Sequence, residues 1–522
     1  MKVQPESLKP TVPPTDADRP LVLALDVGTS SVRAILFDGL GRSLVGLSAR
    51  RSQKLHKAKD GTAEADPDVV ITSICDAIDD LLDRASSLAA EIAAVAVCTF
   101  ASNVLGLDEK QRAVTPLFTY ADTRSVYQAE LLRRELDEES VRQRTGCPFH
   151  ASYLPAQLRW LAAERPELFA QASRWVSVGE YMESQLFSSA RSDTGRPTAV
   201  SYSTASWTGL LNRQKLVWDE ELLEALPIKA VQLSPLIDVD APRFGLADRF
   251  SRRWPALRDV PWFPAVGDGA AANIGSGCVT PHRLALTLGT TSAVRVITEE
   301  PVVEIPAGLW CYRIDHRRSL PGGALTEGGN VFAWMRKTLH LPNGEDLAAA
   351  LSRMTPDDHG LTVLPFLAGE RSPGWVGNIR ATVHGISLAT TPLEILRASM
   401  EAVACRIALV VDRLAPLLAD DCEIVASGGG FQNSPAWVQI VSDCLDRPIK
   451  VTRVEEASAR GAALLALASL GVLADVADAP HFVRDAVEPI AKHQAPYREA
   501  KRRQEKLYDR LVRSLNRPST DQ

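Results

Sequence analysis

The stretch LALDVGTSSVRAILFD, residues 23–38, decides the fold expected for this 522-residue chain. Two apolar runs are joined by a short turn of small residues, and a carboxylate, Asp26, stands just before that turn. Glycine lets a ligand approach the backbone closely, and neighbouring N–H groups and hydroxyls are the donors that a phosphate chain requires. A carboxylate beside them is suited to the metal ion that phosphates carry. The alternative is a tight hairpin turn with a capping aspartate.

The second half of the chain repeats this pattern. Residues 284–295 read LALTLGTTSAVR, so a strand, a Gly-Thr turn and an outgoing basic strand recur about 260 residues later, with Thr287 in place of the carboxylate. A repeat near the middle of a chain indicates two related halves. There is no G-x-x-x-x-G-K-[ST] motif, which excludes a P-loop. Two such turns and one carboxylate suit a nucleotide that is clamped between two domains.

Composition limits the classes of protein that the chain can belong to. Its length predicts at least two domains. The net charge of −6 offers no basic field for nucleic acid, and no apolar run approaches the ~20 residues of a membrane span. The first twenty residues are polar and Pro-rich, without the apolar core of a signal peptide, which predicts a disordered leader on a cytoplasmic protein. Eight scattered cysteines without a C-x-x-C pair predict reduced, mostly buried thiols.

The order of the predicted elements favours an α/β architecture. Strand-like runs at residues 21–27, 35–37 and 92–98 alternate with helical stretches such as residues 67–88, which is typical of a parallel sheet covered by helices. Residues 149–261 consist of mixed Trp, Arg and Pro segments. We expect them to form an insertion on the first core, where substrate binds. The predicted organisation is a leader (1–20), an N-terminal domain (21–277), a C-terminal domain (278–475) and a helical extension (476–522) that contains a solvated helix at residues 497–515.

Two further segments carry residues suited to chemistry. ASGGGFQNSPAW, residues 426–437, follows a predicted strand, and its three glycines permit close approach of a nucleobase or a sugar, although such a triplet also serves packing alone. In AVGDGAAANIGSG, residues 265–277, Asp268 stands between two glycines ahead of a helical run. It is either the N-cap of that helix or a general base that takes the proton of a substrate hydroxyl.

Together these residues resemble the FGGY carbohydrate kinases over roughly residues 21–471. ATVHGISLATTPLEILRASME, residues 381–401, satisfies the C-terminal signature of that family in full, and GERSPGW, residues 369–375, resembles its G-E-R-x-P segment. The N-terminal signature departs at YLPAQLRWL, where Gln157 replaces the usual lysine and loosens the match around the substrate-side loop. The resemblance implies two actin-like ATPase (ribonuclease H-like) domains with an interdomain cleft.

The resemblance also implies roles for individual residues. The catalytic base is Asp268, the metal carboxylates are Asp26 and Asp268, and the cofactors are ATP and Mg²⁺. The implied nucleotide contacts are Gly28, Thr29, Ser30, Gly289, Thr290, Thr291, Gly329, Gly429, Gly430 and Ser434. The expected reaction is in-line transfer of the γ-phosphoryl group to a small-molecule hydroxyl, with domain closure excluding water. A homodimer is compatible with the resemblance, although no interface is readable.

The identity of the acceptor is the weakest part of the prediction. The Arg-Glu pair of glycerol kinases is replaced by Ala101-Ser102, and the Met-His of xylulokinases is absent, whereas YADTRS, residues 120–125, resembles gluconate kinases. Gluconate requires a cation for its carboxylate. The predicted substrate residues are Ser102, Asn103, Asp122, Arg124, Tyr153 and Asp268, with His150 as a residue that could line the pocket.

Three alternatives to a gluconate kinase stay open. One is a kinase for a ketopentose or polyol such as xylulose, ribulose or erythritol. Another is an actin-like ATPase without a small-molecule acceptor, which would have no reason for Asp268 or the G-E-R-S-P segment. The third is a catalytically silent sugar sensor, although nothing is missing from the catalytic set.

Overall fold

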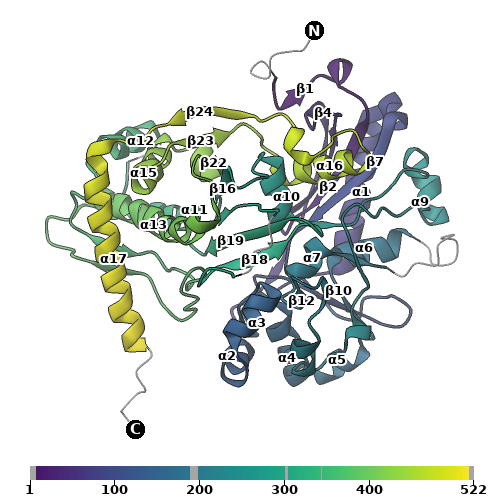
Figure 1. Cartoon of the computed structure of the whole chain (residues 1–522), viewed down its shortest axis with the longest axis horizontal. Helices are drawn as coiled ribbons and strands as arrows, with labels where there is room; N and C mark the ends of the chain where they lie inside the picture. Colours follow the sequence, from purple (N-terminus) through teal and green to yellow (C-terminus); the bar gives the residue numbers. More distant parts are fainter. Residues whose placement is uncertain (1–7, 188–197, 300–303, 343, 516–522) are drawn as a thin grey trace.

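A hairpin of β2 (Leu21–Val27) and β3 (Ser31–Phe37) forms at the opening stretch, with Asp26 directly opposite Arg33. The structure is a computed structural model that describes residues 8–187, 198–299, 304–342 and 344–515 (Figure 1). Both strands are almost wholly buried, which explains their continuous apolar sequence.

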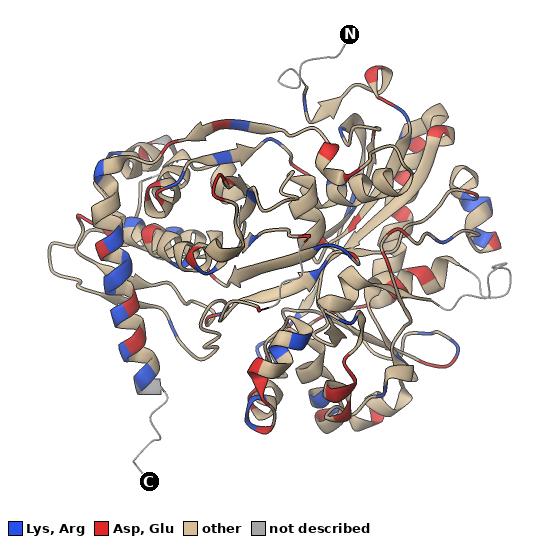
Figure 2. Ribbon diagram, viewed as in Figure 1, with Lys and Arg blue, Asp and Glu red and all other residues tan. Residues whose placement is uncertain are grey.

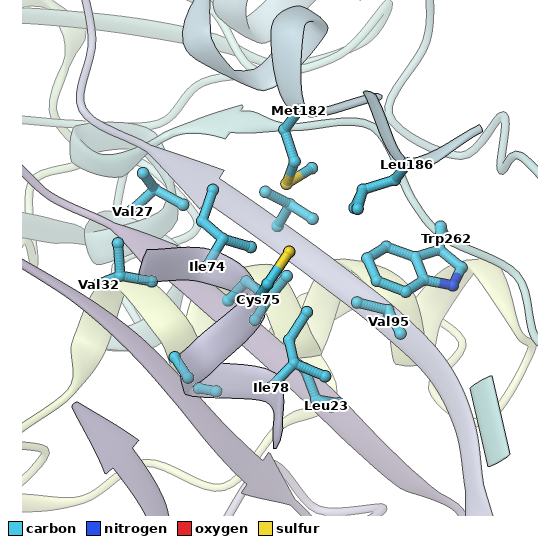
Figure 3. Packing of buried hydrophobic residues seen from close by; sticks show 14 of the residues in the cluster. Leu23, Val27, Val32, Ile74, Cys75, Ile78, Val95, Met182, Leu186 and Trp262 are labelled. Carbon is cyan, nitrogen blue, oxygen red and sulfur yellow. The ribbon is translucent and has the colours of Figure 1, made fainter. Parts of the chain in front are cut away.

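The hairpin lies inside the first of two large sheets. Its strand order is β1-β4-β3-β2-β7-β15, where the added strands are β1 (Thr11–Val12), β4 (Ser43–Ser52), β7 (Ile92–Thr99) and β15 (Val266–Gly267). Helix α1 (Pro67–Ala85) packs on β3 and β4. Figure 3 shows Ile74 and Ile78 of α1 among side chains of the strands, with Met182 of α6 (Val178–Leu186) closing the same core. The predicted helix at residues 67–88 is therefore confirmed.

The second sheet repeats the arrangement in the other half of the chain. Its order is β18-β19-β17-β16-β22-β23-β24, with bounds β16 (Arg283–Leu288), β17 (Ser292–Arg295), β18 (Trp310–Arg313), β19 (Ser319–Leu325), β22 (Glu423–Ser427), β23 (Ile449–Thr452) and β24 (Val483–Val487). The helices on this sheet are α11 (Gly329–Thr338), α12 (Gly344–Arg353), α13 (Pro392–Leu414), α14 (Gly429–Gln432) and α15 (Pro435–Leu445). The expected α/β fold with two related halves is confirmed.

Helix α16 (Ala457–Ser469) does not cover the sheet of its own half. It packs on β2 and β7 of the first sheet and beside α10 (Asp268–Gly275), as Figure 1 shows. Its alanines and leucines join a core that contains Val22 and Ala24 of β2. Residues 457–469 fall within the predicted C-terminal domain (278–475), and their small side chains let this helix lie close to the strands of the N-terminal sheet, which ties the two halves together.

A smaller lobe lies beside the first sheet. Its elements are β8 (Leu105–Leu107), β9 (Leu117–Phe118), α2 (Val126–Glu135), α3 (Glu138–Thr145), α4 (Leu154–Glu164), α5 (Pro166–Gln171), β10 (Arg174–Val176), α7 (Tyr202–Ser206) and α8 (Glu220–Glu224). Helix α9 (Asp248–Arg253), like α6, contributes to the core of the first sheet. Helices α2, α4 and α5 pack together around their own apolar cluster. The segment SSARSDTGRP falls on residues 188–197, outside the described residues.

The prediction of a disordered leader is wrong for residues 8–20. Strand β1 pairs in parallel with β4, and Arg42 Nη2 lies 2.8 Å from Asp18 Oδ2. Arg42 also pairs with the fully buried Asp38. A buried guanidinium needs carboxylate partners, so the leader is held to the sheet edge by charge as well as by backbone bonds.

The helical extension is only partly helical. Strand β24 adds to β23 at the edge of the second sheet, and α17 (Gln494–Leu515) follows it. Figure 2 shows basic and acidic residues along α17, in agreement with the predicted solvated face. Its other face is buried: the side chains of Tyr497 and Gln504 there are only 1% and 2% exposed.

The structure also shows whether the described helices could span a membrane and what state the cysteines are in. None of the described helices has the length and apolar character to cross a membrane. All eight cysteines are free thiols, and six of them are buried, as the sequence predicted.

Candidate functional site

Parallel strands of the first sheet bring Asp26 and Asp268 to one edge. Asp26 pairs in register with Cys98 of β7, and Cys98 pairs with Val266 of β15. Because β2, β7 and β15 run in the same direction, their carboxyl ends meet at this edge, where ligands of α/β proteins commonly bind. Asp268 follows β15 directly and is the first residue of α10.

Asp26 is a buried carboxylate that two side chains contact. Its Oδ2 accepts a hydrogen bond from Arg33 Nη1 at 3.0 Å, and its Oδ1 accepts one from the Cys98 thiol at 3.5 Å. Burial raises the pKa of Asp26, against the lowering effects of Arg33 and Cys98.

Asp268 is the most perturbed carboxylate at this edge. Its Oδ1 accepts the backbone N–H of Gly269 at 2.8 Å. The pKa of Asp268 is raised to about 6, chiefly by burial and also by the negative charge of Asp26, against the opposing effect of Arg295. Such a pKa suits a general base near neutral pH. The side chain does not cap α10, since Gly267 occupies the N-cap position.

Both carboxylates also fit a divalent cation. Hard cations such as Mg²⁺ prefer carboxylate oxygens, and the negative charge of Asp26, which raises the pKa of Asp268, would be relieved by a positive ion between the two carboxylates. The donor set of Asp26 and Asp268 therefore matches the predicted metal role, with no neutral or soft ligand required.

The first turn (residues 28–31) is open at its tip. The Gly28 N–H donates to the Ser31 carbonyl at 3.0 Å, Ser30 is exposed, and Gly28 and Thr29 are partly exposed. Thr29 hydrogen-bonds the Tyr120 hydroxyl. Within the described structure, the buried Ser31 Oγ has no partner. A turn with exposed hydroxyls and an unpaired buried oxygen provides polar groups for a phosphate chain.

The second turn (residues 289–291) is one residue shorter than the first turn. The Gly289 N–H donates to the Thr291 carbonyl at 2.9 Å, and Thr290 and Thr291 are exposed. The N–H groups of Gly329 and Asn330, at the start of α11, donate to the carbonyls of this turn at 2.8 and 3.0 Å. Gly329 was predicted as a nucleotide contact, but its N–H group holds the second turn in place.

The shorter second turn also shifts the outgoing arginine. Arg33 lies opposite Asp26, whereas Arg295 lies opposite Ala285, two residues before Thr287. Thr287 contacts the Ser427 hydroxyl at 3.0 Å and also lies 3.5 Å from Arg295 Nη1. The charge of Asp268 acts on Arg295, whose Nε has no partner among the described residues.

The glycine triplet lies beside the second turn because β16 and β22 are parallel neighbours. Gly428 has φ of +93°, and a Cβ there would lie 2.5 Å from the Leu288 carbonyl oxygen. A Cβ on Gly430 would meet the Leu288 side chain at 2.7 Å, whereas one on Gly429 would meet only Asn433 Nδ2 at 3.5 Å. Two of the three glycines therefore serve packing, and the exposed Gly429 is left for a ligand. Ser434 caps α15 through the Trp437 N–H.

Contacts between the halves show that the two carboxyl edges face one another. Arg33 Nη1 lies 3.2 Å from Glu456 Oε2, and Glu456 follows β23. A Cβ on Gly269 would lie 3.4 Å from Arg295 Nε. Asp268 is thus enclosed by the first hairpin on one side and by the strand that leaves the second turn on the other.

Several predicted substrate residues are committed to the protein interior. The Asn103 amide donates to the Phe100 carbonyl at 2.5 Å and accepts the Val178 N–H at 2.7 Å. Ser102 Oγ donates to the Trp207 carbonyl at 2.7 Å, with φ of +51° at Ser102. Both side chains stabilise the loop after β7, next to the N–H of Ala101 that lowers the pKa of Asp268.

Arg124 and Asp122 form a buried ion pair, not the solvated pair that was the alternative. Arg124 Nη2 lies 2.6 Å from Asp122 Oδ2 and 2.7 Å from Glu64 Oε2. Its guanidinium lies over the Trp160 ring, 4.4 Å from the centroid, with only 11% of the side chain exposed. The predicted cation for a gluconate carboxylate is therefore already neutralised.

Tyr153 is likewise buried, and its hydroxyl contacts that of Tyr312 at 2.5 Å. The side chain of His150, by contrast, is partly exposed. Its Nδ1 accepts the Ser152 N–H at 3.1 Å, so the neutral ring carries its hydrogen on Nε2. The pKa of His150 is lowered to about 3, chiefly by burial and also by the charges of Arg371 and Arg133.

Three residues at the site were not predicted individually. Tyr120 contacts Thr29, Arg295 acts on Asp268, and the charge of Arg371 acts on Tyr120 and His150. All three stand in motifs that the sequence displays, namely YADTRS, the repeat and GERSPGW. Arg371 directly follows Glu370 in the sequence, so nothing in its local sequence sets it apart from an arginine with a neighbouring acidic partner.

Comparisons with known proteins agree with this geometry. Residues 21–275 match the N-terminal domain of the FGGY family of carbohydrate kinases, and residues 284–470 match the C-terminal domain of that family. The chain is 26% identical to a gluconokinase of Bacillus subtilis (strain 168) over 461 residues, which cover 86% of this chain and 88% of that protein.

Two solved structures from Lactobacillus acidophilus are similar over nearly the whole chain. One is described as a gluconate kinase and the other as a ligand-bound xylulose kinase. Each has a TM-score of 0.86 and 25% sequence identity, covering 94% of this chain and 98% of the solved chain.

Proposed function

Because the chain belongs to the FGGY family of carbohydrate kinases, we propose that it transfers the γ-phosphoryl group of ATP to a hydroxyl of a sugar acid, gluconate in particular. The chain is a phosphotransferase with a carbohydrate acceptor, and the identity of that acceptor is the proposal. The observation that carries the chemistry is Asp268, a carboxylate with a pKa of about 6 between two facing strand edges.

Asp268 acts as the general base in this proposal. Its ionised oxygen takes the proton of the attacking hydroxyl as the oxygen–phosphorus bond forms and the bond to the ADP oxygen breaks. The N–H of Gly269 and the Arg295 guanidinium steady the ionised form at neutral pH. Bound Mg²⁺, held by Asp26 and Asp268, would neutralise phosphate charge.

The two turns are the proposed phosphate-binding elements. The first turn offers Gly28, Thr29 and Ser30, and the second offers Gly289, Thr290 and Thr291, all at least partly exposed. Gly429 and Ser434 are proposed to border the adenosine, with Gly329 and Gly430 shaping the same edge through packing. Positioning of the phosphates between two domains supplies much of the rate in such reactions.

Gluconate is favoured by the gluconokinase and gluconate kinase relatives and by the YADTRS segment. A ketopentose is the second candidate, and the similarity to the xylulose kinase structure, with the same TM-score, favours it.

A coupled ADP-release assay tests the proposal. We expect kcat/KM for gluconate to exceed the values for xylulose, ribulose, glycerol and erythritol by at least an order of magnitude. Robust turnover of xylulose or ribulose without turnover of gluconate would establish the second candidate. Sugar binding without ADP release for any of the compounds would point to a silent sensor.

A further inference from the structure

Strand β17 carries a charged residue on a face that is otherwise apolar. Successive side chains of a strand point to opposite faces of its sheet. Ala293 and Ile297, which stand two residues to either side of Arg295, belong to the apolar cluster that joins the two halves, together with Ala270 of α10 and Trp207. The residues in between belong to the core of the second sheet. A guanidinium at such an interface costs free energy unless its charge is compensated.

The internal repeat shows what Arg295 lacks. Its counterpart in the first half, Arg33, lies opposite Asp26 and is neutralised by Asp26 and Glu456. In the second half the turn is shorter and Thr287 stands in place of the carboxylate. Among the described residues, Arg295 forms no ion pair, and its hydrogen bond is the one that Nη1 donates to Thr287 Oγ1 at 3.5 Å. The second half therefore keeps the arginine without a protein anion to neutralise it.

The missing carboxylate, and not the unpaired Nε, distinguishes Arg295 from other buried arginines. Arg33, Arg243 and Arg406 also have a buried Nε without a partner. Each of these three is neutralised by a carboxylate through another nitrogen of its guanidinium. Arg371 likewise forms no ion pair among the described residues, but no hydrogen bond or packing contact there places its guanidinium beside the base. Arg295 combines an uncompensated charge with a defined position at the catalytic edge.

Two contacts define that position. On one side, a Cβ on Gly269 would lie 3.4 Å from Arg295 Nε, and the Gly269 N–H itself donates to the Asp268 carboxylate at 2.8 Å. On the other side, Nη1 lies 3.5 Å from Thr287 Oγ1, two residues before the second turn. The guanidinium therefore lies between the base of the first half and the phosphate-binding turn of the second. In the proposed reaction, the transferred group lies between the same two elements.

We propose that Arg295 is a second catalytic residue, whose guanidinium binds the oxygens of the γ-phosphoryl group during its transfer. The inference rests on the proposed phosphoryl transfer, but not on the identity of the acceptor. The bond from the acceptor oxygen to phosphorus forms, the bond to the ADP oxygen breaks, and Asp268 takes the hydroxyl proton. Arg295 keeps its own proton and supplies positive charge and N–H donors to the phosphoryl oxygens.

Steady-state kinetics of Arg295→Met and Arg295→Lys in the full chain test the inference, with the exposed Arg353→Met as the matched control. We expect Arg295→Met to lower kcat by about 100- to 1,000-fold and to leave KM for ATP and for the acceptor within about threefold. The slow hydrolysis of ATP without a sugar, in which water is the acceptor, should fall by the same factor. Arg295→Lys should retain an intermediate kcat, and the control should match the wild type.

A binding measurement gives a readout that does not depend on turnover. Calorimetry compares the affinity for ADP and Mg²⁺ alone with the affinity in the presence of aluminium fluoride, which mimics the planar phosphoryl group. The wild type should bind ADP more tightly when the mimic is present. Arg295→Met should keep the affinity for ADP alone and lose at least about tenfold of the affinity gained with the mimic. A merely structural role of Arg295 would not separate the two affinities.

Three outcomes would overturn the inference. One is unchanged kinetics of Arg295→Met. Another is a raised KM for the acceptor with unchanged kcat and ATP hydrolysis, which would assign Arg295 to the acceptor. The third is recovery of the wild-type kcat at about pH 9, which would show that Arg295 acts only on the pKa of Asp268.

Failure of the proposed acceptor is a separate result. If gluconate is not phosphorylated, the same measurements apply with the sugar that is turned over, and ATP hydrolysis needs no sugar at all. Unfolding transitions identify a folding defect of Arg295→Met. In that case Arg295→Lys decides, because its kcat must fall while its affinity for ADP is kept.

Discussion

Tyr508 of the last helix donates its hydroxyl to Glu370 Oε2 at 2.5 Å, which ties α17 to the loop that carries Arg371. Tyr508 lies beyond the residues matched by the two family domains, whereas Glu370 lies within the C-terminal match at residues 284–470. Tyr508→Phe removes the donor and leaves a buried carboxylate oxygen under-satisfied. We expect the free energy of unfolding to fall by about 1–3 kcal/mol and KM for the acceptor to rise several-fold. Urea denaturation and steady-state kinetics measure the two effects. Tyr127→Phe, at an exposed tyrosine, is the control, and equal behaviour of both variants would contradict the coupling.

Asp268→Asn should abolish transfer by several orders of magnitude while ADP still binds. In the wild type, kcat/KM should fall about tenfold per pH unit below about 6 and level off above it, because the base must be ionised. A pH profile of kcat/KM and calorimetry with ADP are the measurements. Near-normal activity of the variant would remove Asp268 from its role.

The same substitution has an opposite effect on stability. Because burial raises the pKa of folded Asp268 above the unfolded value of 3.8, its stabilising contribution is present below pH 4 and is lost as the pH rises through 6. Without Mg²⁺ and nucleotide, Asp268→Asn should therefore be more stable than the wild type at pH 8, by up to about 3 kcal/mol. Thermal unfolding at pH 4 and pH 8 checks the sign, and equal differences at both values would contradict it.

Asp26→Asn tests the proposed metal role. The variant keeps the shape of the side chain but loses a charge, so we expect kcat to drop on the order of 10²-fold and the Mg²⁺ requirement to rise. Thr287→Ala, at the corresponding position of the second half, should change the Mg²⁺ requirement little. Titration of activity with Mg²⁺ separates them, and similar curves for both variants would speak against a metal carboxylate at Asp26.

Two neighbouring glycines of the triplet, Gly428 and Gly429, provide a matched pair of alanine variants. Gly428→Ala places a Cβ 2.5 Å from a carbonyl at a positive φ, so it should destabilise the fold by about 1–3 kcal/mol or more. Gly429→Ala meets no backbone, so it should fold normally but raise KM for ATP. Unfolding and ATP titrations distinguish these outcomes. A fully active Gly429→Ala variant would show that this edge does not border the nucleotide.

Arg124→Met should act on stability and not on specificity. Removing one partner leaves Asp122 buried without its cation, at a cost of about 3 kcal/mol or more. The ratio of kcat/KM for gluconate to that for glucitol, in which a neutral hydroxymethyl group replaces the carboxylate, should stay close to the wild-type ratio. A collapse of this ratio in Arg124→Met would restore Arg124 as the carboxylate partner.

The sequence predicted the strands, the two turns and Asp268 because each rests on local information. Alternation of apolar runs with small polar turns specifies a hairpin wherever it occurs, and the repeat locates the second one. The family signature then indicates how the two halves pair.

Long-range pairing explains what the sequence could not predict. Whether Arg124 is free depends on Glu64, sixty residues away, and whether Gly430 contacts a ligand depends on Leu288. The order of residues 8–20 depends on Arg42 and Asp38, whose charges attract a segment that appears disordered by composition. Charge partners and close contacts of this kind are set by tertiary structure.

The chain crosses from one half to the other more than once, because α16 returns to cover β2 and β7. Neither half is therefore a self-sufficient folding unit. A fragment ending near residue 277 would expose the apolar underside of its sheet to water, and synthesis must be almost finished before that surface is sheltered. The return crossing also joins the two halves at a second place.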